Sequence, residues 1–285
     1  MYDITKIDCD DEYNPQSVIE VEVQTTISRS SRFLDSFIEF VRKESPDILT
    51  KTLNRFKDRL TGFEHANLDH VSFDKTPKNF EAFPDIFRHI RAVSLSLLRY
   101  NECIATEKDG KISVTYWNYV RSYLIPLYHL AQTLVDVVPR EQGIDLYQRS
   151  VDYETDQTEK IDESITCLED FFRLAFSKGT PALSRITFLT EKGIAGVKIT
   201  RCLWVDILKE FDDPKISYAV ACHYDLHAAR YINKNFRLTR KKTLMQGNGF
   251  CDFCWHDISI DKEMKHLSDD FWQELDDLAK NRSRL

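Results

Sequence analysis

The segment from Phe236 to Trp255 constrains the fold of this chain more than any other stretch. Its first half is a basic run typical of a strand, and its second half is a short return strand rich in cysteine and aromatic residues. Gly247-Asn248-Gly249 lies between the two halves. Glycine and asparagine adopt the backbone conformations that tight hairpin turns require, so the segment predicts a β-hairpin.

The return strand has two different faces. Successive side chains of a strand point to opposite sides, so residues two apart share a face. The alternation predicts an apolar face in the core and a polar face opposite it. The apolar face comprises Cys251, Phe253 and Trp255, and the polar face comprises Asp252, Cys254 and His256.

The pair Cys251 and Cys254, with His256 nearby, has the spacing of a zinc or redox site. Strand alternation places the two cysteines on opposite faces, and no second Cys-x-x-Cys completes a set of four ligands. We therefore predict no metal site and no cofactor. The remaining histidines, His266 among them, have no partner at metal spacing and are expected to be ordinary surface or buried residues.

Positive charge is concentrated around the hairpin although the chain as a whole is acidic. Between Leu226 and Phe250 there are six Lys or Arg residues and no acid, whereas the net charge is -7. A local cation cluster favours a small anionic substrate over nucleic acid, which needs a broad basic face. The alternative for Lys241 and Lys242 is a solvated edge strand. The candidate substrate-binding residues are Arg240, Lys242, Thr243, Asp252 and Cys254.

The low content of turn-forming residues, 8 Gly and 8 Pro in 285, favours a helix-rich chain with few hairpins. We predict an α+β fold, in which a helical amino-terminal half precedes a small antiparallel sheet of two hairpins packed on helices. No apolar run is long enough for a membrane span, and the acidic amino terminus does not resemble a secretory signal. With an odd number of cysteines, 7, we expect reduced thiols, a cytoplasmic location and no membrane partner. The sequence leaves open whether the protein forms a homodimer.

The pattern of elements suggests where the domains divide. We predict an irregular or extended lead-in over residues 1–28, a helical domain over 29–155 and an α+β domain over 156–285, with the acidic stretch Asp152–Glu163 as the boundary. The expected helices are 31–43, one restarting at Pro46, 84–99, 115–138, 161–176, 203–211, 214–232 and 265–280, and the expected strands besides the hairpin are 184–190 and 197–201.

The predicted helix 214–232 carries the candidate catalytic residues. Cys222 and Asp225 fall on one face of such a helix, and His223 lies on a neighbouring face. A thiol beside a carboxylate is a nucleophile only if a base or a cation lowers its pKa. On spacing alone we favour the alternative, a small core cysteine and an aspartate that pairs with an arginine. The candidate catalytic residues are Cys222, Asp225, His223 and Tyr224.

These segments together resemble the L-2-amino-thiazoline-4-carboxylic acid hydrolase family. The resemblance rests on a Cys-x-x-Asp pair, a basic Thr-Leu strand, a glycine and a Cys-Asp-Phe run, and it covers roughly residues 160 to 260. It implies hydrolytic opening of a cyclic, amidine-like ring. The matching positions are Cys222, Asp225, Arg240, Thr243, Leu244, Gly247, Cys251, Asp252 and Phe253, with Cys202 also included.

Three hypotheses follow for the function. The first is an enzyme that cleaves a C–N bond in a small carboxylate-bearing heterocycle: Arg240 and Lys242 bind the carboxylate, and Cys222 attacks or Asp225 activates water. The second is a non-catalytic binding or interaction module whose cysteines only pack. A metal protein built on Cys222, Cys251 and Cys254 is the third.

Overall fold

The computed structural model describes residues 4–68, 71, 77–99, 110–158, 164–176 and 178–282. The chain forms two compact units, each assembled from segments that are far apart in sequence. We call them the sheet unit and the helical unit. The sheet unit comprises Met1–Asn14, Thr158–Asp206 and Tyr224–Leu285, and the helical unit comprises Pro15–Gln157 and Ile207–His223. This grouping differs from the contiguous division predicted from the sequence. The amino-terminal segment Met1–Asn14 belongs to the sheet unit, and the segment Ile207–His223 belongs to the helical unit.

The helical unit is organised around α4 (Tyr116–Val137), which packs against four other helices and begins at Thr115, whose side chain accepts the N–H of Asn118. Its other helices are α1 (Val23–Glu44), α2 (Pro46–Leu60), α3 (Pro84–Arg99), α5 (Arg140–Thr158) and α8 (Pro214–Ala221). A short 3-10 helix, η1 (Lys209–Phe211), precedes α8. The strands β2 (Val18–Glu22) and β3 (Lys111–Thr115) form a two-stranded sheet in this unit. The predicted helical amino-terminal half is confirmed, and β2 and β3 add a small sheet to it.

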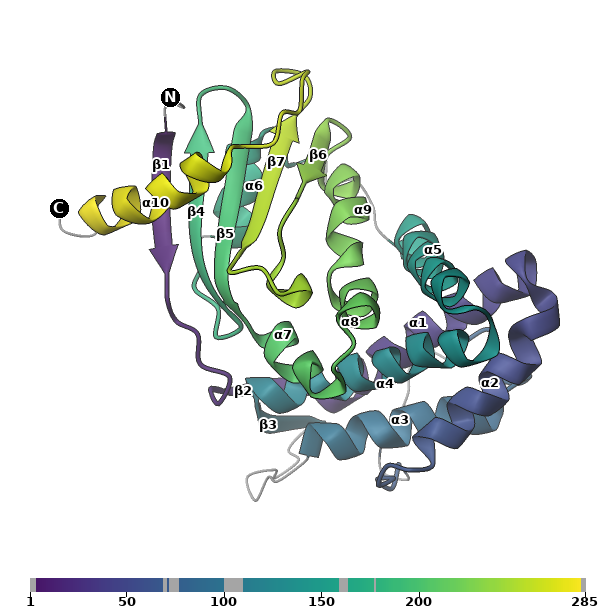
Figure 1. The fold of residues 1–285 in the computed structure, drawn as a ribbon. Coiled ribbons are helices and arrows are strands. Elements are labelled where there is room, and N and C mark those ends of the chain that lie inside the picture. Colours follow the sequence, from purple (N-terminus) through teal and green to yellow (C-terminus); the bar gives the residue numbers. More distant parts are fainter. Residues whose placement is uncertain are drawn as a thin grey trace. The chain divides into compact units, whose positions relative to one another are not determined.

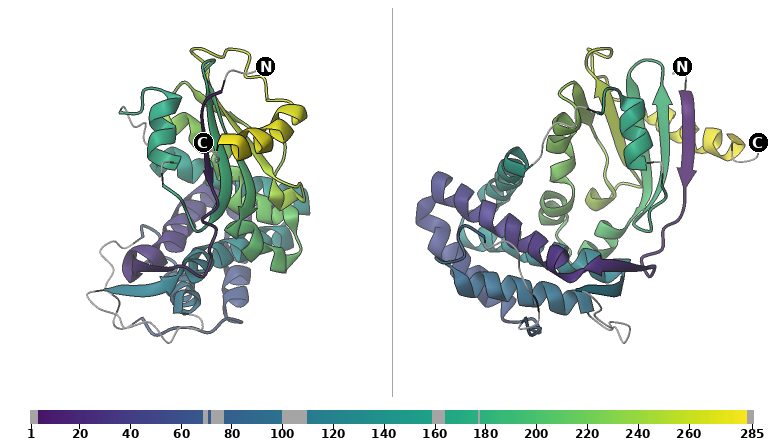
Figure 2. Two further views of the ribbon diagram at one scale, coloured as in Figure 1. Left: turned by 90° about the vertical axis from the view of Figure 1, so that its left-hand side faces the viewer. Right: turned by 180° about the vertical axis from the view of Figure 1, so that it is seen from behind.

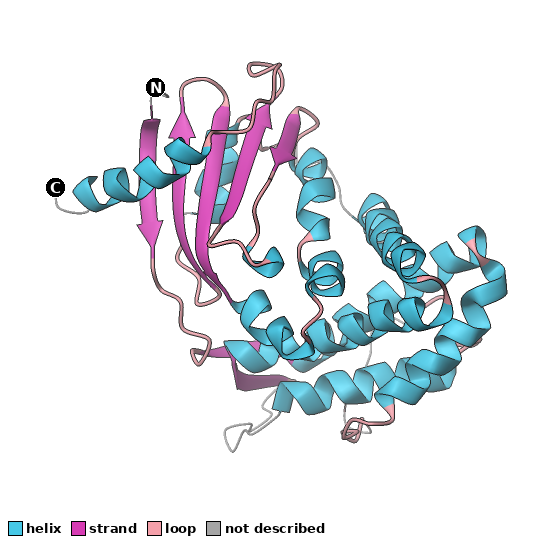
Figure 3. Ribbon diagram, viewed as in Figure 1, coloured by secondary structure: helices cyan, strands magenta, loops and turns pink. Residues whose placement is uncertain are grey.

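The sheet unit contains one antiparallel sheet of five strands in the order β1-β4-β5-β7-β6 (Figures 1 and 3). The predicted α+β class and both predicted hairpins, β4–β5 and β6–β7, are confirmed. The strands are β1 (Ile4–Asp10), β4 (Leu183–Thr190), β5 (Ile194–Cys202), β6 (Phe236–Thr239) and β7 (Cys251–Asp257), and the helices that lie wholly or mostly in this unit are α6 (Leu168–Phe176), α7 (Leu203–Leu208), α9 (His223–Ile232) and α10 (Asp269–Arg282).

The two faces of this sheet have separate cores. Aromatic and aliphatic side chains of α6 and α9 pack on one face with Cys251, Phe253 and Trp255. On the other face α10 packs with Cys254 and Phe188. Figure 2 shows α6 and α10 on opposite sides of the sheet. Close contact between strands requires a glycine at Gly196, where a Cβ atom would lie 2.4 Å from the Phe188 ring.

The structure corrects several boundaries. Within residues 4–28 the predicted lead-in is extended in β1 and β2, but α1 already begins at Val23, and β1 pairs with β4, a partner far away in sequence. The predicted helix 161–176 is shorter, since α6 begins at Leu168, and residues 161–163 lie outside the described part of the chain. The acidic stretch 152–163 is helical up to Thr158, where α5 ends. Among the described residues no helix is both long and apolar enough to span a membrane.

Candidate functional site

The basic segment leaves the sheet after four residues. β6 ends at Thr239, so Arg240 and the two lysines after it follow an extended path outside the strand, and the prediction of a long basic strand is wrong. The chain then turns through η2 (Leu244–Gln246), which Thr243 caps by accepting the Gln246 N–H at 3.2 Å. Gly247 ends this turn with φ 84°, a left-handed conformation that favours glycine.

The side chain of Asp252 explains why the segment departs from the sheet. Asp252 is 1% exposed on β7, and its Oδ1 accepts the backbone N–H groups of Lys241 at 2.9 Å and Lys242 at 2.7 Å. A carboxylate that accepts two N–H groups replaces the ladder hydrogen bonds of a strand partner. Asp252, predicted to bind substrate, therefore fixes the segment that follows Arg240.

Arg240 and Asp225 form a charged pair inside the sheet unit. The Arg240 Nη1 donates to Asp225 Oδ2 at 2.8 Å, and the guanidinium carbon lies 4.7 Å from the centroid of the Phe253 ring. The Arg240 side chain is 1% exposed, whereas that of Asp225 is 35% exposed. The buried guanidinium thus presents a carboxylate that solvent and small molecules can reach.

Three thiols of the sheet unit, those of Cys202, Cys251 and Cys254, are poor nucleophiles as they stand. Burial raises the pKa of Cys251 to about 11, and Cys251 Sγ also accepts the Leu244 N–H at 3.2 Å. Burial likewise raises the pKa of Cys202 to about 12 and that of Cys254 to about 12. Cys254 lies in the apolar cluster under α10 and has no exposed surface. Among the described residues no three His, Cys, Asp or Glu side chains could hold a metal ion together.

The other candidate catalytic residues lie where α8 ends and α9 begins. Cys222 is the residue after α8, so the predicted helix 214–232 is broken at this position and does not form one continuous face. Cys222 and His223 belong to the helical unit, where His223 Nε2 contacts Asp152 Oδ1 at 2.9 Å. Tyr224 is 39% exposed.

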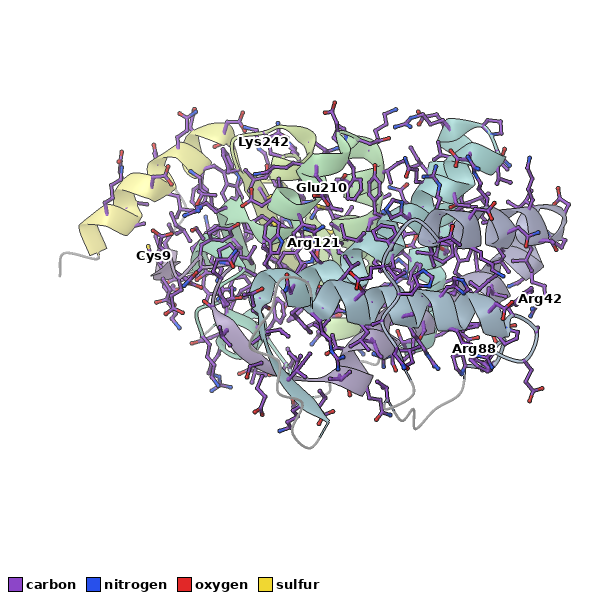
Figure 4. All side chains as sticks on the ribbon, turned by 90° about the horizontal axis from the view of Figure 1, so that it is seen from below. Cys9, Arg42, Arg88, Arg121, Glu210 and Lys242 are labelled. Carbon is purple, nitrogen blue, oxygen red and sulfur yellow. The ribbon has the colours of Figure 1, made fainter. Side chains whose placement is uncertain are left out.

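Lys242 and Thr243 have structural partners. Lys242, labelled in Figure 4, forms an ion pair with Asp269 of α10 at 2.7 Å. Thr243 is 1% exposed, and its hydroxyl donates to Gln246 Oε1 at 2.9 Å. The Thr243 contact stabilises the turn between β6 and β7, and the Lys242 ion pair attaches the segment before this turn to α10.

The sequence did not reveal a buried chain of polar side chains on the α10 face. We call this set of hydrogen-bonded side chains, Asp252, His266, Thr239, His256 and Asp261, the relay. The sequence predicts His266 to be an ordinary surface residue or a satisfied buried histidine, and the structure gives it Asp252 as a partner, to which the loop after β7 brings it. The relay runs from Asp252 Oδ2 to His266 Nε2 at 2.9 Å, from His266 Nδ1 to Thr239 Oγ1 at 2.9 Å, from Thr239 Oγ1 to His256 Nε2 at 2.8 Å and from His256 Nδ1 to Asp261 Oδ2 at 2.6 Å.

Comparison with known families bears on these residues. Residues 118–255 match the L-2-amino-thiazoline-4-carboxylic acid hydrolase family. The match confirms the resemblance seen in the sequence and extends it upstream, to a start within α4. It includes Cys222, Asp225 and Arg240, and it ends one residue before His256. Neither the curated proteins nor the solved structures contain a match to the chain.

Proposed function

We propose that this protein hydrolyses a C–N bond in the ring of a small, carboxylate-bearing cyclic amidine. The observation that carries the proposal is the pair of Arg240 and Asp225, a buried cation and a partly exposed carboxylate within the region that matches a hydrolase family. A carboxylate held in place by a charge-assisted hydrogen bond is a suitable general base.

The proposed reaction consumes one water and needs no redox partner. Asp225 removes a proton from water, and the water oxygen bonds to the amidine carbon while the electron pair of the C=N bond moves to the ring nitrogen. The tetrahedral intermediate then collapses: its hydroxyl proton passes to the ring nitrogen, a C=O bond forms, and the bond from carbon to ring nitrogen breaks, so that the nitrogen leaves as an amine carrying both protons of the water. Tyr224, which precedes Asp225 in the sheet unit, is the proposed proton carrier.

The proposed role of Arg240 is to bind the substrate carboxylate, and Asp225 holds its guanidinium in place before the substrate arrives. Guanidinium and carboxylate groups match in shape and charge. Arg240→Lys keeps the charge but loses the planar fork, so we expect KM for the substrate to rise by more than kcat falls. A fall in kcat with an unchanged KM would mean that Arg240 acts only by orienting Asp225.

Two variants separate general-base catalysis by Asp225 from nucleophilic attack by Cys222. If Asp225 activates water, Asp225→Asn lowers kcat by at least about 100-fold, the usual minimum for a lost acid–base group, whereas Cys222→Ala retains turnover. If Cys222 attacks the ring, Cys222→Ala abolishes turnover. Wild-type turnover in both variants would refute the proposal and favour a non-catalytic binding module.

Thiol labelling provides an independent check on Cys222. The raised pKa of Cys202, Cys251 and Cys254 predicts slow alkylation by iodoacetamide in the native protein. A nucleophilic Cys222 would instead label rapidly, at a rate that stays high below neutral pH. Asp277→Asn is a suitable matched control for Asp225→Asn, because the Asp277 side chain is 81% exposed on α10, and it should keep wild-type kinetics.

A further inference from the structure

The relay requires one proton more than its side chains carry in their neutral or ionised ground states. Its four contacts need four hydrogens, one for each donor–acceptor pair. The Thr239 hydroxyl supplies one hydrogen, and each neutral imidazole supplies one. If both flanking aspartates are carboxylates, one contact is left without a hydrogen. The relay is therefore complete only when it binds one additional proton.

His256 is the disfavoured position for this proton. Burial lowers the pKa of His256, and the charge of His266 lowers it further, while Asp261 opposes both effects. A protonated His266 donates to Asp252 and to Thr239, and the Thr239 hydroxyl then donates to His256. The other acceptor near that hydroxyl, the Cys254 carbonyl, is 3.5 Å away and competes weakly.

Loss of the proton opposes two lone pairs at one contact. One of three groups then faces an imidazole nitrogen that has no hydrogen: the Thr239 oxygen, the Asp252 carboxylate or the Asp261 carboxylate. Buried polar groups without partners are unfavourable, so one contact must open. The contact between His266 and Asp252 matters most, because Asp252 also accepts the N–H groups of Lys241 and Lys242, directly after Arg240.

We infer that Asp252 and His266 are positioning residues for Arg240, and that they hold the Lys241–Lys242 backbone only while the relay keeps its additional proton. The effect of this proton on turnover rests on the proposed function, but its effect on the Lys241–Lys242 backbone does not. Because the family match ends at Trp255, the histidines and Asp261 are features of this chain beyond the matched region.

Several other ionisable groups surround the relay and share its electrostatic environment. The Cys254 thiol lies beside Thr239 and has a raised pKa, so it stays neutral while histidines titrate. The pKa of the Asp269 carboxyl on α10 is lowered, first by its hydrogen bond with Lys242 and also by the charge of His266. The charged groups around the relay are Asp252 on β7, Asp261 after it, Asp269 with its partner Lys242, and Lys198 on β5, which pairs in register with Asp252 and forms an ion pair with Asp276.

Amide hydrogen exchange measured by NMR tests the inference without any substrate. We expect the protection factors of the Lys241 and Lys242 amides to fall about tenfold as the pH rises and the relay loses its additional proton, since a hydrogen bond to a charged group contributes roughly this factor. The same spectra follow the His266 ring nitrogens. Protection factors of these amides that do not change with pH would overturn the inference.

Two substitutions at one position separate the titration from the mere presence of a donor. His266→Gln keeps an N–H donor that does not titrate, so it should retain protection of the two amides and remove the pH dependence. His266→Leu removes the donor and should lower protection at every pH. His89→Gln in the helical unit is the control and should behave as wild type. Equal pH dependence in wild type and His266→Gln would contradict the relay.

The pH profile of turnover tests the positioning of Arg240 separately. We expect kcat to fall at high pH in the wild type and this limb to disappear in His266→Gln. If amide protection follows the relay and turnover does not, the positioning role is overturned while the proposed function stands. If no cyclic amidine is turned over at all, the proposed function fails and the exchange experiment still decides whether the proton is required.

Discussion

The two faces of β7 are both buried, but the face toward α10 combines an apolar cluster with a set of buried polar side chains. On the face toward α6 and α9, Trp255 and Phe253 stack with their ring centroids 5.5 Å apart, and Trp255 also meets Phe171 of α6 at 5.8 Å. On the face toward α10, Asp252 and His256 belong to the relay. Alternation along a strand determines which side chains share a face, but only the covering elements decide whether a polar face is solvated or buried.

The comparison also shows how buried charges are accommodated under α10. The Lys198 side chain is 5% exposed, and its ammonium donates to the Trp272 carbonyl at 2.6 Å and to Asp276 at 2.8 Å. Each buried charge on this face has a hydrogen-bonding partner, as the desolvation cost requires. The apolar face depends on shape complementarity, and the buried charges of the polar face depend on hydrogen bonds, whereas Trp272 Nε1 on that face has no hydrogen-bond partner among the described residues.

Removal of the largest ring from the apolar face should have the greatest effect on stability. Trp255→Ala deletes a side chain that is 7% exposed and packs on four aromatic rings. We expect the free energy of unfolding to drop by about 3–5 kcal/mol, measured by urea denaturation, and by the same amount at each pH. A loss that varies with pH would break the distinction between the faces.

A change of charge on the polar face should have a smaller effect. Asp252→Asn keeps the shape of the side chain but weakens its hydrogen bonds to two backbone amides and to His266. We expect a loss of about 2 kcal/mol in the free energy of unfolding, in the range for hydrogen bonds to charged groups. If the loss equals that of Trp255→Ala, the polar face contributes as much as the apolar core, and our ranking is wrong.

The pH dependence of the free energy of unfolding should depend on the polar face of β7 and not on the apolar face. The pKa of His256 is lowered in the folded protein, so the unfolded chain binds its proton more tightly. As the pH falls below about 6.5, the ordinary value for histidine, protonation favours the unfolded state and the free energy of unfolding decreases. His256→Gln should flatten this slope and Trp255→Ala should not. An unchanged slope in His256→Gln would contradict a lowered pKa.

The smallest effect is expected at Lys198. Lys198→Met replaces a buried ammonium by an apolar side chain of similar length, and its partner Asp276 is 43% exposed and stays solvated. Replacement of a buried charge by an apolar group is often neutral, so we expect a change within about 1 kcal/mol in thermal or urea unfolding. A loss above that value would show that this ion pair is a main attachment of α10.

The sequence predicted local features well and long-range ones poorly. Helix 84–99, the break before Pro46 and the two faces of β7 depend on spacing and on proline geometry, and the structure confirms them. The pairing of β1 with β4 joins residues more than 170 positions apart, as Cys9 and Ile186 show, and no local pattern encodes it.

The candidate site shows the same limit. Arg240 and Asp225 could be nominated from residue type and spacing, and their pairing was anticipated as an alternative. The relay could not, because His266 and Asp261 reach β7 through an irregular segment whose path depends on its own contacts. Backbone capture by Asp252 likewise shortened β6, against the strand preference of the residues that follow Thr239.

Ring opening in isotopically labelled water tests the central claim most directly. The purified protein is incubated with L-2-amino-thiazoline-4-carboxylic acid and related cyclic amidine carboxylates in H₂¹⁸O, and the products are analysed by mass spectrometry. We predict a ring-opened product that has gained one water, with a single ¹⁸O on the former amidine carbon, and no product with Asp225→Asn. Absence of ring opening for every substrate, or equal product from Asp225→Asn, would contradict the account.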